Sequence, residues 1–334
     1  MSAARMKAIQ VTRYGGAEVL ELRDVECPQP APGEARIKLA YAGVNFIDVY
    51  TRNGLYARSH TYANEPPFTL GREGCGTVDA IGAQVQGLAV GDRVAWCLAL
   101  GSYAQYACVP AWRLVKIPDA MSRKIATTLM LQGCTAHYQT HSLFPLEPGH
   151  TCLIHAASGG VGRLMVQLAK LRGALVFATV GSEEKAVQAR ALGADHVILY
   201  REQDFAAQVL RETFGEGVDV VYDSVGQATI AGSIRCCKRR GTVSNFGAAS
   251  GAVTSVDPLE LAEAGSLFFT RPHMADYMRD AEEVNWRGSE MFAHVAAGRL
   301  QVSIDRVLPL AEAAAAHRIL EGRGTTGKLL LATD

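Results

Sequence analysis

Short apolar runs alternate with helix-like stretches through the middle of the chain. From Thr151 onward the apolar runs recur at residues 152–155, 175–180, 196–199, 218–222 and 242–246. The segments between them carry the spacing of amphipathic helices. Repeated β-α units of this length predict a parallel sheet with crossover helices, the doubly wound α/β arrangement. The middle of the chain is therefore a predicted nucleotide-binding domain.

The two ends of the chain have a different pattern. Before residue 120, short β-like runs at 35–44, 76–81, 93–96 and 103–109 are separated by Gly- and Pro-containing turns, which predicts a compact domain rich in strands. A last apolar run at 328–332 is a lone strand that needs strand neighbours, so we place it on this first domain. We expect one domain from residues 1–128 and 273–334, and a second from 129–272.

Composition adds limits on function. The 334 residues include 33 Lys+Arg and 33 Asp+Glu, so net charge gives no support for binding to nucleic acid or to an anionic membrane. No apolar run approaches the roughly 20 residues that span a bilayer, and the N-terminus leads into no apolar signal segment. The eight cysteines form no C-x-x-C pair and are read as reduced thiols. We expect a cytoplasmic protein.

A glycine-rich loop follows the first strand of the β-α series. Residues 156–162 read Ala-Ala-Ser-Gly-Gly-Val-Gly, a G-x-G-x-x-G pattern with Ala157 in place of the first glycine. Glycine lets the backbone approach a pyrophosphate, and the N-H groups and dipole of the next helix attract the anion. A simple tight turn is the alternative, but the position between strand and helix favours dinucleotide binding. The predicted contacts are Ser158, Gly159, Gly160, Val161 and Gly162.

The end of the second strand of the series bears on the choice of cofactor. An NAD enzyme normally has an acidic residue about 20 residues beyond the loop, where this chain has Thr179-Val180-Gly181. The missing acid leaves room for a 2′-phosphate, and Lys185 lies one turn into the next helix, where it could pair with that group. With Ser182 as N-cap, Glu183 and Glu184 are first-turn acids of that helix. The predicted cofactor is NADPH.

Several longer strings resemble a known family. They are residues 43–56 (GVNFIDVYTRNGLY), 71–76 (GREGCG), 91–94 (GDRV), 221–226 (VYDSVG) and 269–272 (FTRP). Over nearly its whole length the chain resembles the zinc-independent quinone oxidoreductases of the medium-chain dehydrogenase/reductase superfamily. The resemblance implies a GroES-like catalytic domain built from both chain ends, a central Rossmann domain, a cleft between them and a homodimer joined by edge strands of the Rossmann sheets.

The same resemblance implies roles for individual residues. It assigns Lys185, Tyr200 and Arg323 to the adenosine 2′-phosphate, Gly160, Val161 and Phe246 to the length of the cofactor, and Asn45 to the surroundings of the nicotinamide. Thr135 lies in a segment that borders the cofactor in relatives, although it could be an ordinary helix residue. Lys328 flanks Gly324-Thr-Thr-Gly327 and is a further candidate for binding the cofactor.

The resemblance also implies that metal is absent. Zinc-bearing members have Cys and His where this chain has Asn45 and Arg72. Zn²⁺ prefers thiolate, imidazole and carboxylate ligands, and a guanidinium is a permanent cation. His137 and His141 are four apart, but the sequence shows no third ligand for them. We therefore expect no metal, and hydride transfer to a quinone is easier than alcohol oxidation because a Lewis acid is not required.

Five residues are candidates for contact with the reacting groups. Asn45 and Asp48 are three apart, so both could point from one helical turn toward the substrate, with turn capping as the alternative. Tyr50 and Tyr56 could stack on a quinone, bond its carbonyl or donate a proton, with simple packing as the alternative. Arg271 could place positive charge near the acceptor, or Arg-Pro could mark a domain crossover.

The leading hypothesis is thus an NADPH-dependent quinone reductase. An enal or enone reductase uses the same hydride geometry and then needs a protonation step. A crystallin-like or RNA-binding protein that retains NADPH binding is the less favoured alternative. The intact glycine-rich loop indicates cofactor binding, and the balanced charge speaks against nucleic acid.

Overall fold

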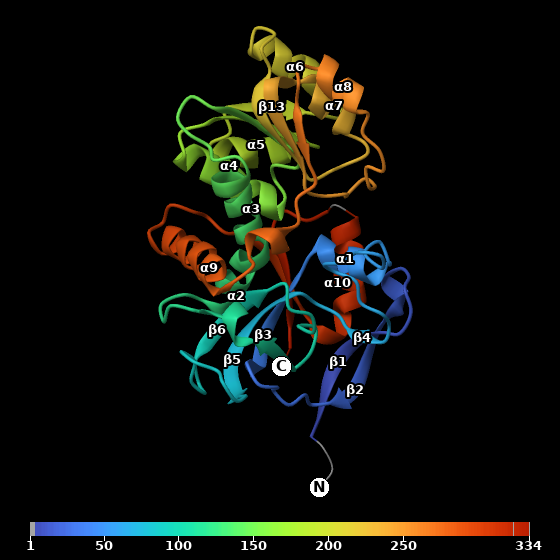
Figure 1. Cartoon of the computed structure of the whole chain (residues 1–334), viewed down its shortest axis with the longest axis vertical. Helices are drawn as coiled ribbons and strands as arrows, with labels where there is room; N and C mark the ends of the chain where they lie inside the picture. The colour runs from blue at the N-terminus through green and yellow to red at the C-terminus, as the bar shows by residue number, and fades with distance from the viewer. Residues whose placement is uncertain (1–3, 323, 334) are drawn as a thin grey trace. The chain divides into compact units, whose positions relative to one another are not determined.

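Two compact units make up the computed structural model, which describes residues 4–322 and 324–333 (Figure 1). The first unit contains the residues up to Cys134 and those from Met278 on, and the second is Thr135–Tyr277. The expected boundaries at 128 and 272 fall a few residues before the observed ones. The reason is a run of helix from Arg123 to Leu143, which carries the chain from one unit into the other without a loop.

The second unit is built on a parallel sheet of six strands, in the order β11-β10-β9-β12-β13-β14. Every neighbouring pair is parallel, which confirms the doubly wound prediction. The strands are β9 (Thr151–Ile154), β10 (Leu175–Val180), β11 (His196–Leu199), β12 (Val218–Asp223), β13 (Cys237–Asn245) and β14 (Phe268–Thr270). The helices between them are α4 (Gly160–Leu171), α5 (Glu183–Ala191), α6 (Phe205–Glu212), α7 (Ile230–Arg235) and α8 (Pro258–Glu263). Apolar side chains of β9, β10 and β12, such as Leu153, Phe177 and Val221, are buried in one cluster with α6 and α7.

The first unit is built on two sheets. Its larger sheet has seven strands, in the order β15-β16-β3-β5-β6-β8, with β7 paired to β3. The smaller sheet has the order β2-β1-β4. The strands are β1 (Arg5–Val11), β2 (Leu20–Glu26), β3 (Glu34–Val44), β4 (Phe68–Thr69), β5 (Glu73–Ile81), β6 (Arg93–Cys97), β7 (Tyr106–Pro110), β8 (Val115–Lys116), β15 (Ile304–Pro309) and β16 (Lys328–Ala332).

The last strand joins the chain end to the first unit. β16 pairs antiparallel with β3 and parallel with β15. This register confirms that the terminal apolar run returns to the first domain. The apolar residues of β16 point into a core shared with β1 and α10, in which Leu329 and Leu331 are almost completely buried.

The helices of the first unit are few and short, apart from one. They are α1 (Phe46–Arg52), α2 (Arg123–Thr128), α9 (Ala281–Ala296) and α10 (Ala313–Glu321), with single 3₁₀ turns at Ala17–Val19, Ala111–Arg113 and Leu310–Glu312. The helical run that leaves this unit contains the π-helical turns η3 (Leu129–Gly133) and η4 (Gln139–Leu143), with α3 (Cys134–Tyr138) between them. A further 3₁₀ turn, η5 (Met274–Tyr277), ends the second unit.

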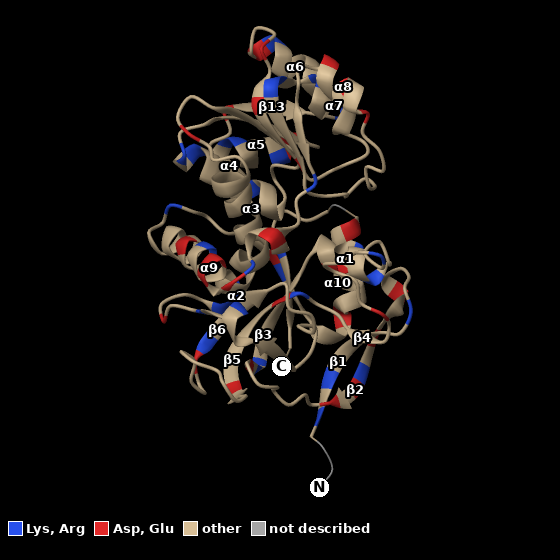
Figure 2. Cartoon of the chain, viewed as in Figure 1, with Lys and Arg blue, Asp and Glu red and all other residues tan. Residues whose placement is uncertain are grey.

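Charge is mixed over both units. Figure 2 shows acidic and basic residues interspersed on the helices and strands of each, as the equal numbers of the two kinds require. None of the helices in the described part of the chain is long and apolar enough to cross a membrane.

Candidate active site

The glycine-rich loop lies between β9 and α4, as predicted. Gly159 is the N-cap of α4, which begins at Gly160. A Cβ atom added at Gly162 would collide with the carbonyl oxygen of Ala156 and lie 2.8 Å from Cα of Ala157. The backbone at this point therefore has room only for glycine. The first N-H groups of a helix have no acceptor within the helix, so this end of α4 supplies donors suited to a phosphate.

Ala157 stands where the glycine-rich pattern has its first glycine, and the backbone explains why alanine fits there. The residue of the loop with a left-handed backbone is Ala156, at φ 50°, and Ala157 is not among the residues with positive φ. Alanine at position 157 therefore causes no backbone strain. The missing first glycine therefore leaves the path of the loop between β9 and α4 unhindered at this position.

The end of β10 gathers the residues predicted at the 2′-phosphate. Ser182 is the N-cap of α5, and its Oγ accepts a hydrogen bond from the backbone N of Lys185. Glu183 and Glu184 are in the first turn of α5, as expected. Tyr200 follows β11, and its hydroxyl would lie 3.0 Å from a Cβ atom added at Gly181. Ser182, Lys185 and Tyr200 thus surround the carboxyl ends of two adjacent strands.

Arg323, the third residue that the resemblance assigns to the 2′-phosphate, lies outside the described residues. The strand end itself carries no carboxylate, since residues 179–181 are Thr, Val and Gly. The half-buried Lys185 is therefore the candidate cation nearest this strand end by sequence and capping geometry.

A buried polar network supports the same edge of the sheet. The Oδ1 atom of Asp223, at the end of β12, accepts hydrogen bonds from the backbone N atoms of Val225 and Gly226, each at 2.9 Å. Its Oδ2 atom accepts from the hydroxyls of Thr229 (2.7 Å) and Ser233 (2.8 Å). Ser233 also lies 3.1 Å from Nε2 of His155.

This network fixes the loop after β12 beside the glycine-rich loop. The other imidazole nitrogen of His155 lies 2.9 Å from the hydroxyl of Thr179 in β10, so one set of bonds joins β9, β10 and β12. Burial lowers the pKa of His155, which keeps the ring neutral. We missed Asp223 as a positioning residue, although the string 221–226 that contains it contributed to the family resemblance.

The remaining cofactor candidates of this unit are the half-buried Phe246 and the buried Ser158 and Thr135. Phe246 follows β13, and its backbone N donates to the carbonyl oxygen of Asp223 at 2.9 Å. Ser158 is almost buried within the glycine-rich loop. Thr135 lies in α3, where its hydroxyl contacts Sδ of Met274 at 3.4 Å. The structure places Phe246 and Ser158 at the edge of the sheet where the strands end.

In the first unit, Asp48 holds the start of α1. Asn45 is the N-cap of this helix, and its backbone N donates to Oδ2 of Asp48 at 2.9 Å. Asp48 is completely buried and also accepts from the backbone N of Arg72 (3.1 Å) and the hydroxyl of Tyr103 (3.3 Å). We predicted a catalytic role for Asp48, with turn capping as the alternative. The structure shows the carboxylate capping α1, and a direct part in the reaction stays a prediction.

Two effects act on the charge of Asp48. Burial raises its pKa to about 7, while the positive charges of Lys328 and Arg72 and the hydrogen bond from Asn45 act in the opposite direction. All three hydrogen-bonding neighbours are donors, so the geometry favours the carboxylate form.

Lys328 and Glu73 form a completely buried ion pair beside Asn45. The Lys328 ammonium also donates to Oδ1 of Asn45 at 2.6 Å. Glu73 accepts from Nδ2 of Asn45 at 2.9 Å and, through its other oxygen, from the backbone N of Leu131 at 2.6 Å. The prediction that Lys328 binds the cofactor needs correction, because its ammonium is directed into the protein interior toward these two side chains.

The residues at this place do not fit a zinc ion. The Glu73 carboxylate is already occupied by three donors, and the adjacent ammonium would repel a dication. Nη2 of Arg72 donates to the carbonyl oxygen of Tyr62 at 2.9 Å, and its guanidinium lies over the Tyr62 ring. An amide and a guanidinium supply no thiolate or imidazole ligand.

The two candidate tyrosines belong to one aromatic cluster. The rings of Tyr50 and Tyr56 meet edge to face with centroids 5.6 Å apart, and Tyr56 is 5.2 Å from Tyr62. Phe46 extends the cluster, 5.9 Å from Tyr50. Tyr50 and Tyr62 are buried and Tyr56 is half-buried, so Tyr56 is the member best placed to meet a ligand. Our sequence prediction did not include Tyr62.

A series of hydrogen-bonded polar side chains connects Asp48 with α10. The hydroxyl of Tyr103 lies 3.1 Å from Nε2 of His317, and Nδ1 of His317 lies 3.1 Å from Nη1 of Arg52. Arg52 in turn forms a salt bridge of 2.9 Å with Glu321. These residues join α1 to α10, and we did not predict them because they lie more than 200 residues apart in sequence.

Arg271 lies in the second unit, directly after β14. It is exposed, and its Nη1 donates to the carbonyl oxygen of Pro272 at 3.3 Å. Its role near an acceptor stays a prediction.

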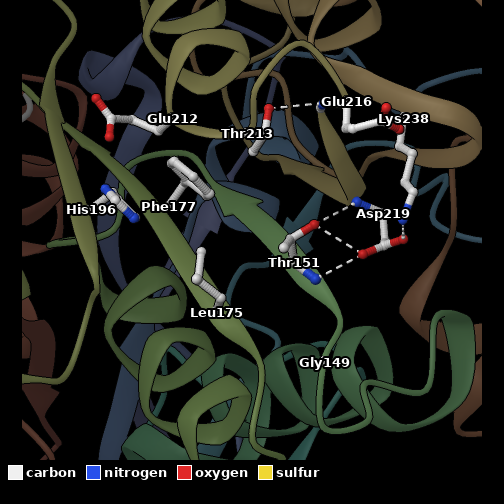
Figure 3. Close-up of a pocket in the computed structure, with 11 residues that line it drawn as sticks. Gly149, Thr151, Leu175, Phe177, His196, Glu212, Thr213, Glu216, Asp219 and Lys238 are labelled. Atoms are coloured by element: carbon white, nitrogen blue, oxygen red, sulfur yellow. Dashed lines mark hydrogen bonds and ion pairs between the residues drawn. The ribbon is translucent and has the colours of Figure 1, made fainter.

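A separate pocket of about 240 Å³ lies at the opposite edge of the parallel sheet, where the strands begin (Figure 3). Its polar wall is Asp219, which accepts from the backbone N and hydroxyl of Thr151 and pairs with Lys238 at 3.1 Å. The glycine-rich loop and Ser182 follow the carboxyl ends of the strands. This pocket is therefore not part of the predicted cofactor site.

Two family models match separate parts of the chain. Residues 31–119 match the alcohol dehydrogenase GroES-like domain, and residues 192–331 match the zinc-binding dehydrogenase family. The first match contains Asn45 and Glu73, and the second contains Asp223 and Lys328.

Known proteins are similar over almost the full chain. A quinone oxidoreductase of Pseudomonas aeruginosa is 41% identical over 326 residues, which are 97% of this chain and 99% of that protein. A 2-haloacrylate reductase of a Burkholderia species is 40% identical, over 97% of this chain and 98% of that protein. The crystal structure of Escherichia coli quinone oxidoreductase complexed with NADPH superimposes with a TM-score of 0.94 at 38% identity, covering 98% of this chain and 99% of that one.

Proposed function

This chain belongs to the quinone oxidoreductase family of the medium-chain dehydrogenase/reductase superfamily, and we propose that it reduces a quinone with NADPH and without a metal ion. The observation that carries the proposal is the glycine-rich loop at the start of α4, together with a strand end that has Lys185 and Tyr200 instead of an acidic residue. The NADPH complex of the Escherichia coli relative supports the same cofactor.

The residues of the second unit fit such a cofactor. The glycine-rich loop would hold the pyrophosphate through the first N-H groups of α4. Ser182, Lys185 and Tyr200 would hold the 2′-phosphate, where the ammonium supplies a charge-assisted hydrogen bond. When bound, NADPH supplies a hydride from its nicotinamide ring. Thr135, Phe246 and Asn45 are the proposed neighbours of its remaining length.

The first unit contributes the proposed surroundings of the acceptor. The aromatic cluster of Phe46, Tyr50, Tyr56 and Tyr62 offers flat apolar surface, and the Tyr56 hydroxyl is the polar group on its accessible side. A quinone accepts a hydride to give the hydroquinone anion, which takes up a proton from solvent to become the aromatic hydroquinone. The protein therefore chiefly has to orient the reactants. We keep Arg271 as a proposed source of positive charge near the acceptor.

The reduction of an activated C=C bond is a second candidate. The 2-haloacrylate reductase of Burkholderia is as similar to this chain as the quinone oxidoreductases are. Such a reaction uses the same hydride donor but also needs a proton for the second carbon, and the tyrosine hydroxyls of the aromatic cluster are the candidate donors.

We also propose that the chain forms a homodimer in the cytoplasm. β14 is the last strand of its sheet and pairs with β13 in the described structure. Phe268 of β14 and Leu259 of α8 are 65% and 64% exposed. An apolar edge strand of this kind is suited to pairing with a second copy. The cysteines at all eight positions carry free thiols, which agrees with a reducing compartment.

The proposal is tested with purified protein and NADPH, by following absorbance at 340 nm with a panel of acceptors. The panel contains 1,4-benzoquinone, 9,10-phenanthrenequinone, trans-2-hexenal and 2-chloroacrylate, and each reaction is repeated with NADH. We expect the highest kcat/KM for a quinone with NADPH. Turnover confined to hexenal or 2-chloroacrylate would move the function to alkene reduction, and preference for NADH would overturn the cofactor assignment.

A further inference from the structure

The buried set of Asn45, Glu73 and Lys328 fixes one side chain of the proposed site. All three residues are at most 4% exposed. Lys328 comes from β16, Glu73 from β5 and Asn45 from the start of α1, so the set joins three elements of the first unit. This inference rests on the proposed function, in which Asn45 lies near the nicotinamide.

The chemistry of the partners decides the orientation of the Asn45 amide. The ammonium of Lys328 can only donate, so the atom 2.6 Å from it must be the amide oxygen Oδ1. The carboxylate of Glu73 can only accept, so the atom 2.9 Å from it must be Nδ2. Nδ2 also donates to the carbonyl oxygen of Gly43 at 3.3 Å. A rotated amide would face both charged partners with the wrong atom.

The amide therefore presents a fixed atom toward any ligand. Both hydrogens of Nδ2 are used inside the protein, by Glu73 and Gly43. Oδ1 has a second lone pair beyond the bond from Lys328. Asn45 can thus act on a neighbouring group as an acceptor, but not as a donor without breaking a bond to Glu73 or Gly43.

The ion pair is not explained by stability alone. A buried ion pair commonly contributes no more than a well-packed apolar pair of the same volume, because desolvation of the charges offsets their attraction. The backbone of β3 at Gly43 also packs directly against the Lys328–Glu73 pair. A Cβ atom at Gly43 would collide with Oε2 of Glu73 and lie 2.9 Å from Cε of Lys328, so β3 has a glycine where the pair passes.

We propose that Lys328 is a positioning residue for the reaction, which acts with Glu73 to hold the Asn45 amide in a single orientation beside the nicotinamide. Glu73 adds a connection to η3 through the bond from the backbone N of Leu131. The position of the Asn45 side chain is thereby set by β5, β16 and the helical run from Arg123, rather than by α1 alone.

A double-mutant cycle in kcat tests this role. Lys328→Met alone would leave a buried, unpaired carboxylate, so the working variant is Lys328→Met with Glu73→Gln, which removes both charges together. It is compared with Asn45→Ala, with the triple variant, and with Lys328→Arg as the conservative substitution. Lys116→Met is the matched control, because Lys116 forms an ion pair with Asp92 at the surface of the same unit.

We expect the charge-free variant and Asn45→Ala each to lower kcat with quinone by about tenfold to 100-fold, since small misplacements in a site have effects of this size. The triple variant should be no slower than Asn45→Ala, because Lys328 acts through Asn45. The KM for NADPH and the dissociation constant of NADPH, measured by nicotinamide fluorescence, should change less than about threefold. Lys328→Arg, which keeps the positive charge, should retain more of the wild-type kcat than the charge-free variant does.

Additive losses in the triple variant, or a charge-free variant that retains full kcat, would overturn the positioning role. Circular dichroism and the Tm of each variant are measured so that unfolding is not mistaken for a loss of kcat. If the charge-free variant does not fold, Lys328→Gln with Glu73→Gln, which removes both charges but keeps polar side chains, replaces it in the same cycle. A wild-type protein inactive with every acceptor would instead contradict the proposed function.

Discussion

Nη1 of Arg52 donates a hydrogen bond to Nδ1 of His317, with 3.1 Å between the two nitrogens. Because a guanidinium only donates, Nδ1 must be the acceptor and the imidazole proton must be on Nε2, where the Tyr103 oxygen lies 3.1 Å away. Burial and the charge of Arg52 lower the pKa of His317 to about 3. The folded protein therefore holds a neutral histidine between α1 and α10.

This histidine predicts a loss of stability in acid. An unfolded chain takes up a proton on His317 near pH 6.5, whereas the folded chain does so only near pH 3. The free energy of unfolding therefore falls as the pH drops through this window, by about 2 kcal/mol at pH 5 from this residue. His317→Gln keeps one acceptor and one donor without a titratable group.

Urea unfolding at pH 8 and pH 5 measures the effect. We expect the decrease in the free energy of unfolding between the two values to be smaller in His317→Gln than in the wild-type protein. Equal decreases would show that the histidine does not contribute.

Lys185 predicts the preference between the two nicotinamide cofactors. Lys185→Ala should raise the dissociation constant for NADPH by about tenfold to 100-fold, since a hydrogen bond to a charged group contributes about 1.5 to 3 kcal/mol. The dissociation constant for NADH should hardly change. Fluorescence titration of both cofactors gives the ratio, with Lys116→Ala as a control lysine in the first unit. Equal weakening of NADPH and NADH would remove Lys185 from the 2′-phosphate site.

The hydrogen bonds of Asp223 predict that Asp223→Asn and Asp223→Ala differ in stability and in NADPH binding. Asparagine keeps an acceptor for the backbone N atoms of Val225 and Gly226, and the hydroxyls of Thr229 and Ser233 can rotate to accept from its NH₂ group. Alanine leaves both backbone groups without a partner, at a cost of about 1 to 3 kcal/mol each. Asp223→Ala should therefore destabilise the protein and weaken NADPH binding much more than Asp223→Asn. Chemical unfolding and fluorescence titration compare the two, and similar losses would disprove the network as described.

The exposed side chain of Phe268 allows the proposed homodimer to be tested by substitution. Phe268→Lys places a charge on the exposed edge strand β14, which opposes pairing with a second copy. Light scattering after gel filtration should give the mass of two chains for the wild-type protein and of one chain for the variant. Val187→Lys is the control, since Val187 is also an exposed apolar residue, at 59%, but lies on α5. A monomeric wild-type protein would contradict the homodimer.

The elements were largely predictable because their patterns are local. The apolar run at 328–332 coincides with β16, and the run at 175–180 coincides with β10. The strand expected at 242–246 starts five residues too late, because β13 already opens at Cys237 in the structure. The glycine-rich loop was also readable, since its chemistry depends on consecutive residues.

The first-unit part of the site was less predictable because its contacts are distant in sequence. Asn45 and Lys328 are 283 residues apart, and nothing near either residue indicates the other. Lys328 was therefore assigned to the cofactor from its neighbouring glycines. For Asp48 the sequence left catalysis and turn capping open, because both kinds of carboxylate have the same spacing. The structure adds the buried donors from Arg72 and Tyr103.

The most direct test of the central claim is to measure zinc content and quinone-dependent NADPH oxidation on the same sample, before and after exhaustive chelation. The ammonium of Lys328 lies between Asn45 and Glu73, so we predict no stoichiometric zinc and an unchanged kcat after chelation. A kcat that falls on chelation and returns when zinc is added would contradict reduction by NADPH without a metal.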